Sequence, residues 1–128
     1  MRALIIEDDP LIAMMIEDQL SNLGYAAIDL AHSQEEAICL AEKQCPDLIT
    51  VDEKLDSGSG VAAIRHICRD KAIPVVFITV DPESILKSVP DAVVIEKPIS
   101  LHSLAPAIQM ATETARVYWE SLVDFQKA

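Results

Sequence analysis

Polar side chains follow four of the short aliphatic runs in this sequence, each at the point where a run ends. They are Glu7, Asp8 and Asp9 after residues 3–6, Asp52 after 48–51, Thr79 after 75–78, and Glu96 and Lys97 after 92–95. Two carboxylates about 4–5 Å apart repel each other by roughly 3–4 kcal/mol at an effective dielectric constant of about 20. A divalent cation relieves that repulsion, and a few carboxylates with waters suit Mg²⁺. With an ammonium group added, such a set could neutralise a phosphoryl group during its transfer.

The order of the aliphatic runs explains how these side chains could meet. Five runs, at residues 3–6, 26–30, 48–51, 75–78 and 92–95, alternate with segments of helical periodicity. Strands that are apolar on both sides and separated by helices are typical of a parallel sheet with helices on both faces. Right-handed crossovers place the carboxyl ends of the strands at one edge, where the functional crevice of such sheets lies. We therefore expect one α/β domain with the polar side chains gathered at that edge.

Capping residues indicate where the first two helices begin and end. Asp9 can cap the first helix, with Pro10 at its first position and Gly24 at its exit. Residues 33–36 have the pattern of a capping box for the second helix, which should end before Pro46.

A long last helix is expected from near Ser100, with apolar residues at alternating three- and four-residue steps. These residues are Leu101, Leu104, Ile108, Ala111, Ala115, Tyr118, Leu122 and Phe125. Such spacing forms a heptad seam. We therefore divide the chain into a domain at 1–112 and a helical extension at 113–128. The extension would support a homodimer or bind a partner helix, unless it folds back on its own domain. Pro106 would kink this helix or move its start to Ser103.

Composition and charge exclude several classes of function. The formal net charge of −11 would repel nucleic acid and anionic membranes. No apolar run approaches the length of a membrane span, and no signal peptide is recognisable. Cys39, Cys45 and Cys68 have no disulfide or metal-ligand spacing, which indicates reduced thiols. We expect a soluble cytoplasmic protein that binds neither nucleic acid nor membrane.

Four segments resemble motifs of response-regulator receiver domains, the phosphoacceptor modules of bacterial two-component signalling. They are residues 5–11, 46–52, 74–79 and 96–98. In order, they resemble the acidic first loop, the strand that delivers the phosphoacceptor aspartate, the strand-four hydroxyl and the strand-five Lys-Pro motif. The likeness covers about residues 2–112. It implies a flavodoxin-like (βα)5 three-layer sandwich with the strand order 2-1-3-4-5.

The resemblance also implies roles for the polar residues. Asp52 would accept a phosphoryl group from a histidine kinase or phosphotransfer protein. The Mg²⁺ ligands would be Asp8 and Asp52 directly, Glu7 through water, and the backbone carbonyl of Lys54. Thr79 would hydrogen-bond one phosphoryl oxygen after transfer, and Lys97 would pair with another. The chain would be a signalling switch that changes its protein contacts, and no enzyme beyond assisting its own phosphorylation and dephosphorylation.

Two features depart from the family pattern. Val94 stands where receivers carry a Tyr or Phe that rotates on activation, and the short interval before Lys97 leaves room for only a truncated fourth helix. We therefore expect output through an atypical version of the face at residues 80–95. Lys54 and Asp81 flank the path of hydrolytic water in receivers, where they would form an ion pair or stay separately solvated.

Two other functions are weighed against the switch. A pseudo-receiver, which has the same fold and works without phosphorylation, is compatible with Val94 and the shortened helix. The complete set of Asp8, Asp52, Thr79 and Lys97 favours the switch. A Mg²⁺-dependent phosphatase that forms an aspartyl phosphate would need a second acid as general acid and a cap over its substrate, and the sequence offers neither.

Overall fold

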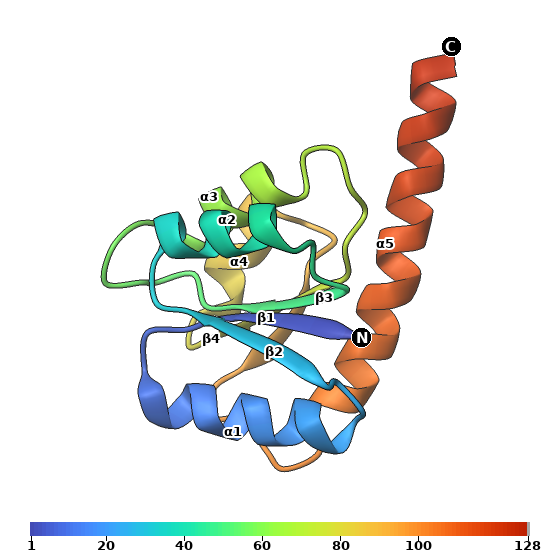
Figure 1. Ribbon diagram of the computed structural model, residues 1–128. Helices are drawn as coiled ribbons and strands as arrows, with labels where there is room; N and C mark the ends of the chain where they lie inside the picture. The colour runs from blue at the N-terminus through green and yellow to red at the C-terminus, as the bar shows by residue number, and fades with distance from the viewer. Residues whose placement is uncertain (128) are drawn as a thin grey trace.

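The aliphatic runs form five strands, and the amphipathic segments between them form five helices (Figure 1). The computed structural model describes the backbone of residues 1–127 and the side chains of residues 1–115. The strands are β1 (Arg2–Ile6), β2 (Ala27–Ala31), β3 (Leu48–Val51), β4 (Val75–Thr79) and β5 (Val93–Glu96). The helices are α1 (Pro10–Asn22), α2 (Gln34–Lys43), α3 (Gly60–Ile67), α4 (Pro82–Ser88) and α5 (Leu104–Lys127).

All the strands are parallel and lie in the order β2-β1-β3-β4-β5, which confirms the predicted topology. In β1, Leu4 and Ile6 pack into one core cluster while Ala3 and Ile5 pack into the other, because both faces of the sheet are covered. Helices α2, α3 and α4 cover the first face, and α1 and α5 cover the second (Figure 1). The strand order reverses between β1 and β3, so a crevice is expected at their carboxyl ends.

The predicted caps of α1 are confirmed. The Asp9 carboxylate accepts a hydrogen bond from the N–H of Leu11 at 2.9 Å, and Pro10 is the first helical residue. Gly24 has a φ of +98°, a conformation that few side chains tolerate, and it ends the helix as expected.

The predicted capping box of α2 is half correct. Ser33 accepts a hydrogen bond from the N–H of Glu36 at 3.2 Å. The Glu36 carboxylate, however, accepts from the N–H of His32 rather than from that of Ser33. His32 is the first residue after β2, and the direct step from strand to helix brings its N–H within reach of Glu36.

The start of α5 lies beside Ser103, the alternative start that Pro106 suggested, rather than near Ser100. The helix begins at Leu104, so Pro106 lies in its first turn, where an N–H has no partner within the helix and no kink is needed. Leu101 lies before the helix and is 77% exposed, so its inclusion in the seam was wrong. Leu104 and Ala111 are buried.

The backbone of α5 continues through Lys127 and extends past the layer of α2 and α3 (Figure 1). The side chains of Tyr118, Leu122 and Phe125 lie outside the described part of the chain. The division at residues 112 and 113, and the association of the extension, therefore stay predictions. The expected truncation of the fourth helix is confirmed, because α4 has seven residues.

Candidate functional site

Three acidic side chains meet at the carboxyl ends of β1 and β3. Ile6 and Val51 are partners in the sheet, so the residues that follow them lie side by side. Glu7 is 1% exposed and Asp52 is 8% exposed. One carboxylate oxygen each of Glu7, Asp8 and Asp52 lies within 4.8 Å of the other two. The predicted convergence of the acids is thus observed.

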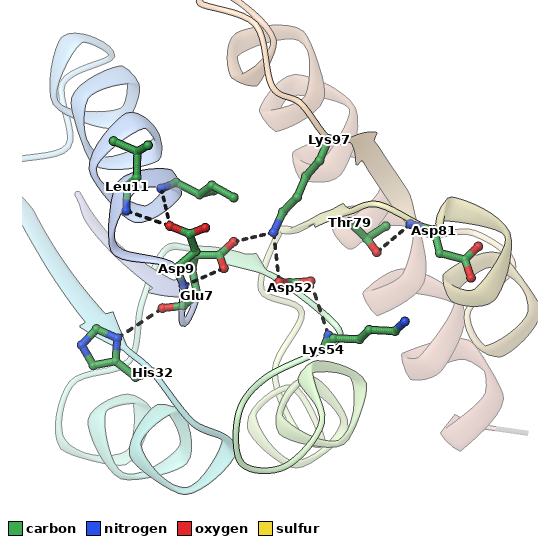
Figure 2. Close-up of polar contacts among 10 residues, drawn as sticks. Glu7, Asp9, Leu11, His32, Asp52, Lys54, Thr79, Asp81 and Lys97 are labelled. Atoms are coloured by element: carbon green, nitrogen blue, oxygen red, sulfur yellow. Dashed lines mark hydrogen bonds and ion pairs between the residues drawn. The ribbon is translucent and has the colours of Figure 1, made fainter.

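The ammonium group of Lys97 bridges the two buried carboxylates (Figure 2). Its Nζ lies 3.0 Å from Oδ2 of Asp52 and 3.1 Å from Oε1 of Glu7. The backbone N–H of Lys97 donates to the carbonyl of Thr79 at 2.8 Å, which fixes the end of β5 beside β4. Burial alone would lower the pKa of Lys97, but the contacts with Asp52 and Glu7 outweigh it and raise the pKa. The ammonium is therefore a fixed positive charge at neutral pH.

The pKa of the Glu7 carboxyl group is raised. Burial raises its pKa to about 7, although the N–H of Asp9 and the ammonium of Lys97 both stabilise the anion. The negative charge of Asp52 adds to the increase in pKa. The Lys97 ammonium thus does not compensate fully for the burial of Glu7 beside Asp52.

The donor set fits Mg²⁺. Magnesium takes oxygen ligands at about 2.0–2.1 Å in an octahedron, so two ligands on opposite sides of the ion are about 4 Å apart. The three carboxylate oxygens lie within 4.8 Å of one another, which is close to that spacing. A divalent cation would also stabilise the ionised form of Glu7, which burial disfavours.

Thr79 ends β4 at the same edge, and its hydroxyl group is already engaged. The side chain is 3% exposed, and Oγ1 accepts a hydrogen bond from the N–H of Asp81 at 3.1 Å (Figure 2). Asp81 in turn caps α4 by accepting from the N–H of Ser84 at 3.3 Å. The hydroxyl therefore connects the site directly to the start of α4.

Lys54 contributes its backbone to the site and turns its side chain to solvent. Its N–H donates to Oδ1 of Asp52 at 3.3 Å (Figure 2). Among the ion pairs of the residues that the structure describes, none joins Lys54 to Asp81. The Asp81 carboxylate is occupied with capping α4, and both side chains are exposed, where an ion pair contributes little. The role of the Lys54 carbonyl stays a prediction.

Sequence reasoning missed Glu53, which closes the loop after Asp52. Its carboxylate accepts from the hydroxyl of Ser59 at 2.7 Å and from the N–H of Val61 at 2.9 Å. Its carbonyl accepts from the N–H of Gly60 at 3.0 Å. A Cβ on Gly60 would lie 2.1 Å from the carbonyl oxygen of Asp52, so only glycine allows α3 to approach this closely. A lone acid before a polar loop gives no signal of such a contact in the sequence.

Asp56 is a fourth acid that sequence reasoning did not include. The charge of Asp8 and a hydrogen bond with it raise the pKa of the Asp56 carboxyl group. The two side chains therefore face each other at the rim of the site, and Asp56 adds negative potential there. Its position in the polar loop that follows Asp52 was the one available signal.

Comparison with known proteins agrees with this geometry. A family model described as the response regulator receiver domain matches residues 3–109. The phyllosphere-induced regulator PhyR of Methylorubrum extorquens is 38% identical over 112 residues, which cover 84% of this chain and 42% of that protein. The transcriptional regulatory protein PdtaR of Mycobacterium tuberculosis is 33% identical over 119 residues, which cover 90% of this chain and 58% of that protein. The chain thus spans about half the length of these relatives.

A solved structure supports the fold assignment. The solution structure of the receiver domain of PhyR from Erythrobacter litoralis is similar with a TM-score of 0.79 and 32% identity, covering 87% of this chain and 88% of that one. Among the described residues, no helix combines the length and the apolar character needed to cross a bilayer.

Replacing Glu7 with Gln should remove a pH dependence of stability. The pKa of Glu7 is about 7 in the folded chain and 4.5 ordinarily, so folding favours the protonated carboxyl. The contribution of this preference is complete below pH 4.5 and is lost as the pH rises through about 7. In urea titrations with a chelator, we expect the free energy of unfolding of wild type to fall relative to Glu7→Gln over that range. Glu17→Gln, an exposed change on α1, is the control, and a constant difference between wild type and Glu7→Gln would contradict the prediction.

Replacing Glu53 with Ala should destabilise the loop after Asp52. The N–H of Val61 and the hydroxyl of Ser59 lose their acceptor, which should cost about 1–2 kcal/mol of unfolding free energy. Glu53→Gln keeps an acceptor oxygen and should recover most of the loss. A double-mutant cycle with Ser59→Ala measures the coupling between the two side chains. Additive effects of the two substitutions would show that the contact contributes nothing.

Proposed function

Because this chain belongs to the response regulator receiver domain family, we propose that it is a phosphorylation switch whose phosphoacceptor is Asp52. The observation that carries the proposal is the position of the Asp52 carboxylate. Oδ2 faces the Lys97 ammonium at 3.0 Å, Oδ1 accepts from the N–H of Lys54 at 3.3 Å, and two further acids lie alongside. A carboxylate nucleophile, a fixed positive charge and a set of oxygen donors for a cation are the parts that phosphoryl transfer needs.

The transfer itself would proceed from a phosphohistidine of a kinase or phosphotransfer protein. An oxygen of Asp52 attacks phosphorus, the N–P bond of the donor breaks, and the released imidazole keeps the bonding electron pair and takes up a proton. Lys97 pairs with a phosphoryl oxygen and balances the charge that the transfer brings into the pocket. Mg²⁺, when bound, neutralises phosphoryl and carboxylate oxygens. Its ligands would be Asp8, Asp52, Glu7 through water and the Lys54 carbonyl.

Phosphorylation would reach the rest of the molecule through Thr79. In the unphosphorylated chain, Oγ1 accepts from the N–H of Asp81. If the hydroxyl turns to donate to a phosphoryl oxygen, that N–H loses its acceptor and the first turn of α4 is free to shift. We therefore infer that the output surface includes residues 80–95, as the sequence suggested. Val94, which packs against the core cluster next to α2 and α3, has no aromatic ring that could rotate when Thr79 moves.

The second candidate is an interaction module that works without phosphorylation. Val94 favours it, because the usual aromatic residue that reports phosphorylation is missing. The buried arrangement of Glu7, Asp52 and Lys97 favours the switch, since an interaction module has no use for ionised groups that are costly to bury.

The phosphodonor would dock beside the site, on α1 and the segment after Lys97. Leu11 is 67% exposed, Met14 is 66% exposed and Leu101 is 77% exposed. The side chain of Gln19 holds the two segments together through hydrogen bonds to the carbonyl of Ser100 and the N–H of Leu104. An apolar surface next to the nucleophile suits a transient contact with a helical phosphotransfer protein, which would take place in the cytoplasm.

Incubation with Mg²⁺ and a small phosphodonor should add one phosphoryl group to the protein. We expect the mass increase in the wild type and in Asp18→Asn, an exposed change on α1, but not in Asp52→Asn. Omitting Mg²⁺ should slow the reaction strongly, because the acids then repel the incoming phosphoryl group. A mass increase that persists in Asp52→Asn would refute the assignment of the nucleophile. Failure of the wild type to react would favour the interaction module.

Leu11→Ala and Met14→Ala should slow transfer from a phosphorylated protein donor without affecting the small phosphodonor. Loss of apolar contact at the interface should reduce the transfer rate about tenfold. Met110→Ala, at an exposed methionine of α5, is the matched control. Equal losses with both donors would mean that the substitutions disturb the site itself, and no loss with the protein donor would exclude this docking surface.

A further inference from the structure

A groove of about 880 Å³ lies at the amino ends of β4 and β5, away from the acidic site. Its walls come from α3, from the segment between α4 and β5, and from the middle of α5. Apolar side chains form most of its floor, among them Val61, Ile64, Val75, Phe77 and Val93. Phe77 and Val61 also belong to the core cluster under α3, so the groove opens directly onto the core.

The truncation of α4 explains why this groove is open. The helix has only seven residues and ends at Ser88, and the chain then passes through Val89, Pro90 and Asp91 toward β5. A longer helix in this position would cover the space beside α3. Here the space stays open to solvent and offers several apolar contacts to a binding partner.

The charges along the groove are unevenly distributed. Arg65, Arg69 and Lys71, on α3 and the loop that follows it, line the groove. They are three of the ten basic residues in a chain that has 21 acidic ones. Asp91 and Glu113 lie among the lining residues from the other walls. Arg69 also pairs with Asp70 at 3.4 Å, but both side chains are exposed, so the pair is weak and the Arg69 guanidinium can exchange it for an acidic partner. The groove is therefore one place where this strongly acidic molecule presents positive charge beside an apolar surface.

We propose that the groove binds an amphipathic helix of a partner protein, with an acidic flank. Apolar side chains at i, i+3, i+4 and i+7 would fill the groove, and acidic side chains on one flank would contact the wall formed by α3. The net charge of −11 repels an acidic partner at long range, so attraction by Arg65, Arg69 and Lys71 has to act at contact distance. Charge thus selects the orientation of the helix more than its affinity.

The groove is also connected to the switch, and this part of the inference rests on the proposed function. The guanidinium of Arg65 donates to the carbonyl of Ser88, the last residue of α4, at 3.4 Å. Ser88 and Asp91 both line the groove. A shift of α4 that starts at Thr79 would therefore move one wall of the groove against α3, and the affinity for the partner helix would depend on phosphorylation.

The probe for a test is a synthetic helical peptide with leucines at the four anchor positions and glutamates along one flank. A second peptide with lysines on that flank serves as the negative probe. We expect the first peptide to bind wild type saturably in fluorescence anisotropy, and the second to bind at least about tenfold more weakly. Arg69→Glu combined with Lys71→Glu should weaken binding of the acidic peptide about tenfold. Both residues are exposed, and the substitutions reverse the charge on this side of the groove. Lys43→Glu, which reverses an exposed charge on α2, is the control and should leave binding of the peptide unchanged.

Three outcomes would refute the proposed docking site. They are no saturable binding of the acidic peptide, equal binding of the two peptides, and binding that Arg69→Glu with Lys71→Glu leaves unchanged. Sedimentation of the chain alone tests for a second copy as occupant. A wild-type dimer that Arg69→Glu with Lys71→Glu dissociates would assign the groove to self-association and refute a partner helix.

The connection to the switch is tested with beryllofluoride and Mg²⁺ as a phosphate mimic. We expect the dissociation constant of the acidic peptide to change about fivefold or more in wild type and not in Asp52→Asn. An unchanged constant, in a protein whose Asp52 still accepts a phosphoryl group, would refute the connection alone. Peptide binding by a protein that cannot be phosphorylated would instead refute the proposed function and leave the docking site in place.

Discussion

The ammonium of Lys97, shared by two buried carboxylates, is the interaction on which the site depends. Taking Glu7 and Asp52 out of water costs several kcal/mol for each unpaired charge, and Lys97 is the cation that contacts both. Lys97 reaches them from the end of β5, two strands away from β3. The edge strand β5 therefore supplies a residue on which the site depends, although its own residues are half-buried at Val93, Val94 and Ile95 and exposed at Glu96. The pairing of β5 with β4 is therefore needed to place Lys97 in the site.

The pairing with Lys97 does not fully offset the burial of Glu7. Although the ammonium contacts Glu7 and Asp52, burial and then the charge of Asp52 still raise the pKa of Glu7 to about 7, and the carboxylate of Asp8 lies nearby. A divalent cation bound by these carboxylates would stabilise the ionised form of Glu7. The contacts of Glu53 and the bare Cα of Gly60 hold the loop after Asp52 closed while this charge is in place. Electrostatic strain is thus confined to groups that a ligand can relieve.

The sequence was sufficient to predict most of the fold and the members of the site. The parallel sheet, the caps at Asp9 and Gly24, and the convergence of Asp8, Asp52 and Lys97 follow from hydrophobic runs and from what ends them, whereas the strand order came from the family resemblance. Features set by tertiary distance were not predictable. Glu53 binds residues six and eight positions ahead, Asp56 is significant only because it faces Asp8, and Gln19 of α1 bonds to Ser100 and Leu104, more than 80 positions away. None of these contacts follows from a repeating pattern of residues in the sequence.

The shape of α4 decides how a signal can leave the site. Ile85 is the one buried residue that anchors this seven-residue helix, and its first turn is held by Asp81, whose own N–H is bonded to Thr79. A helix with a single anchor moves as a unit more readily than it bends. Val94 lies in the core beneath it and has no ring to rotate. In the proposed switch, a change at Thr79 would therefore be transmitted as a displacement of the backbone, and that displacement would alter a surface at the far end of α4, where Ser88 accepts a hydrogen bond from Arg65.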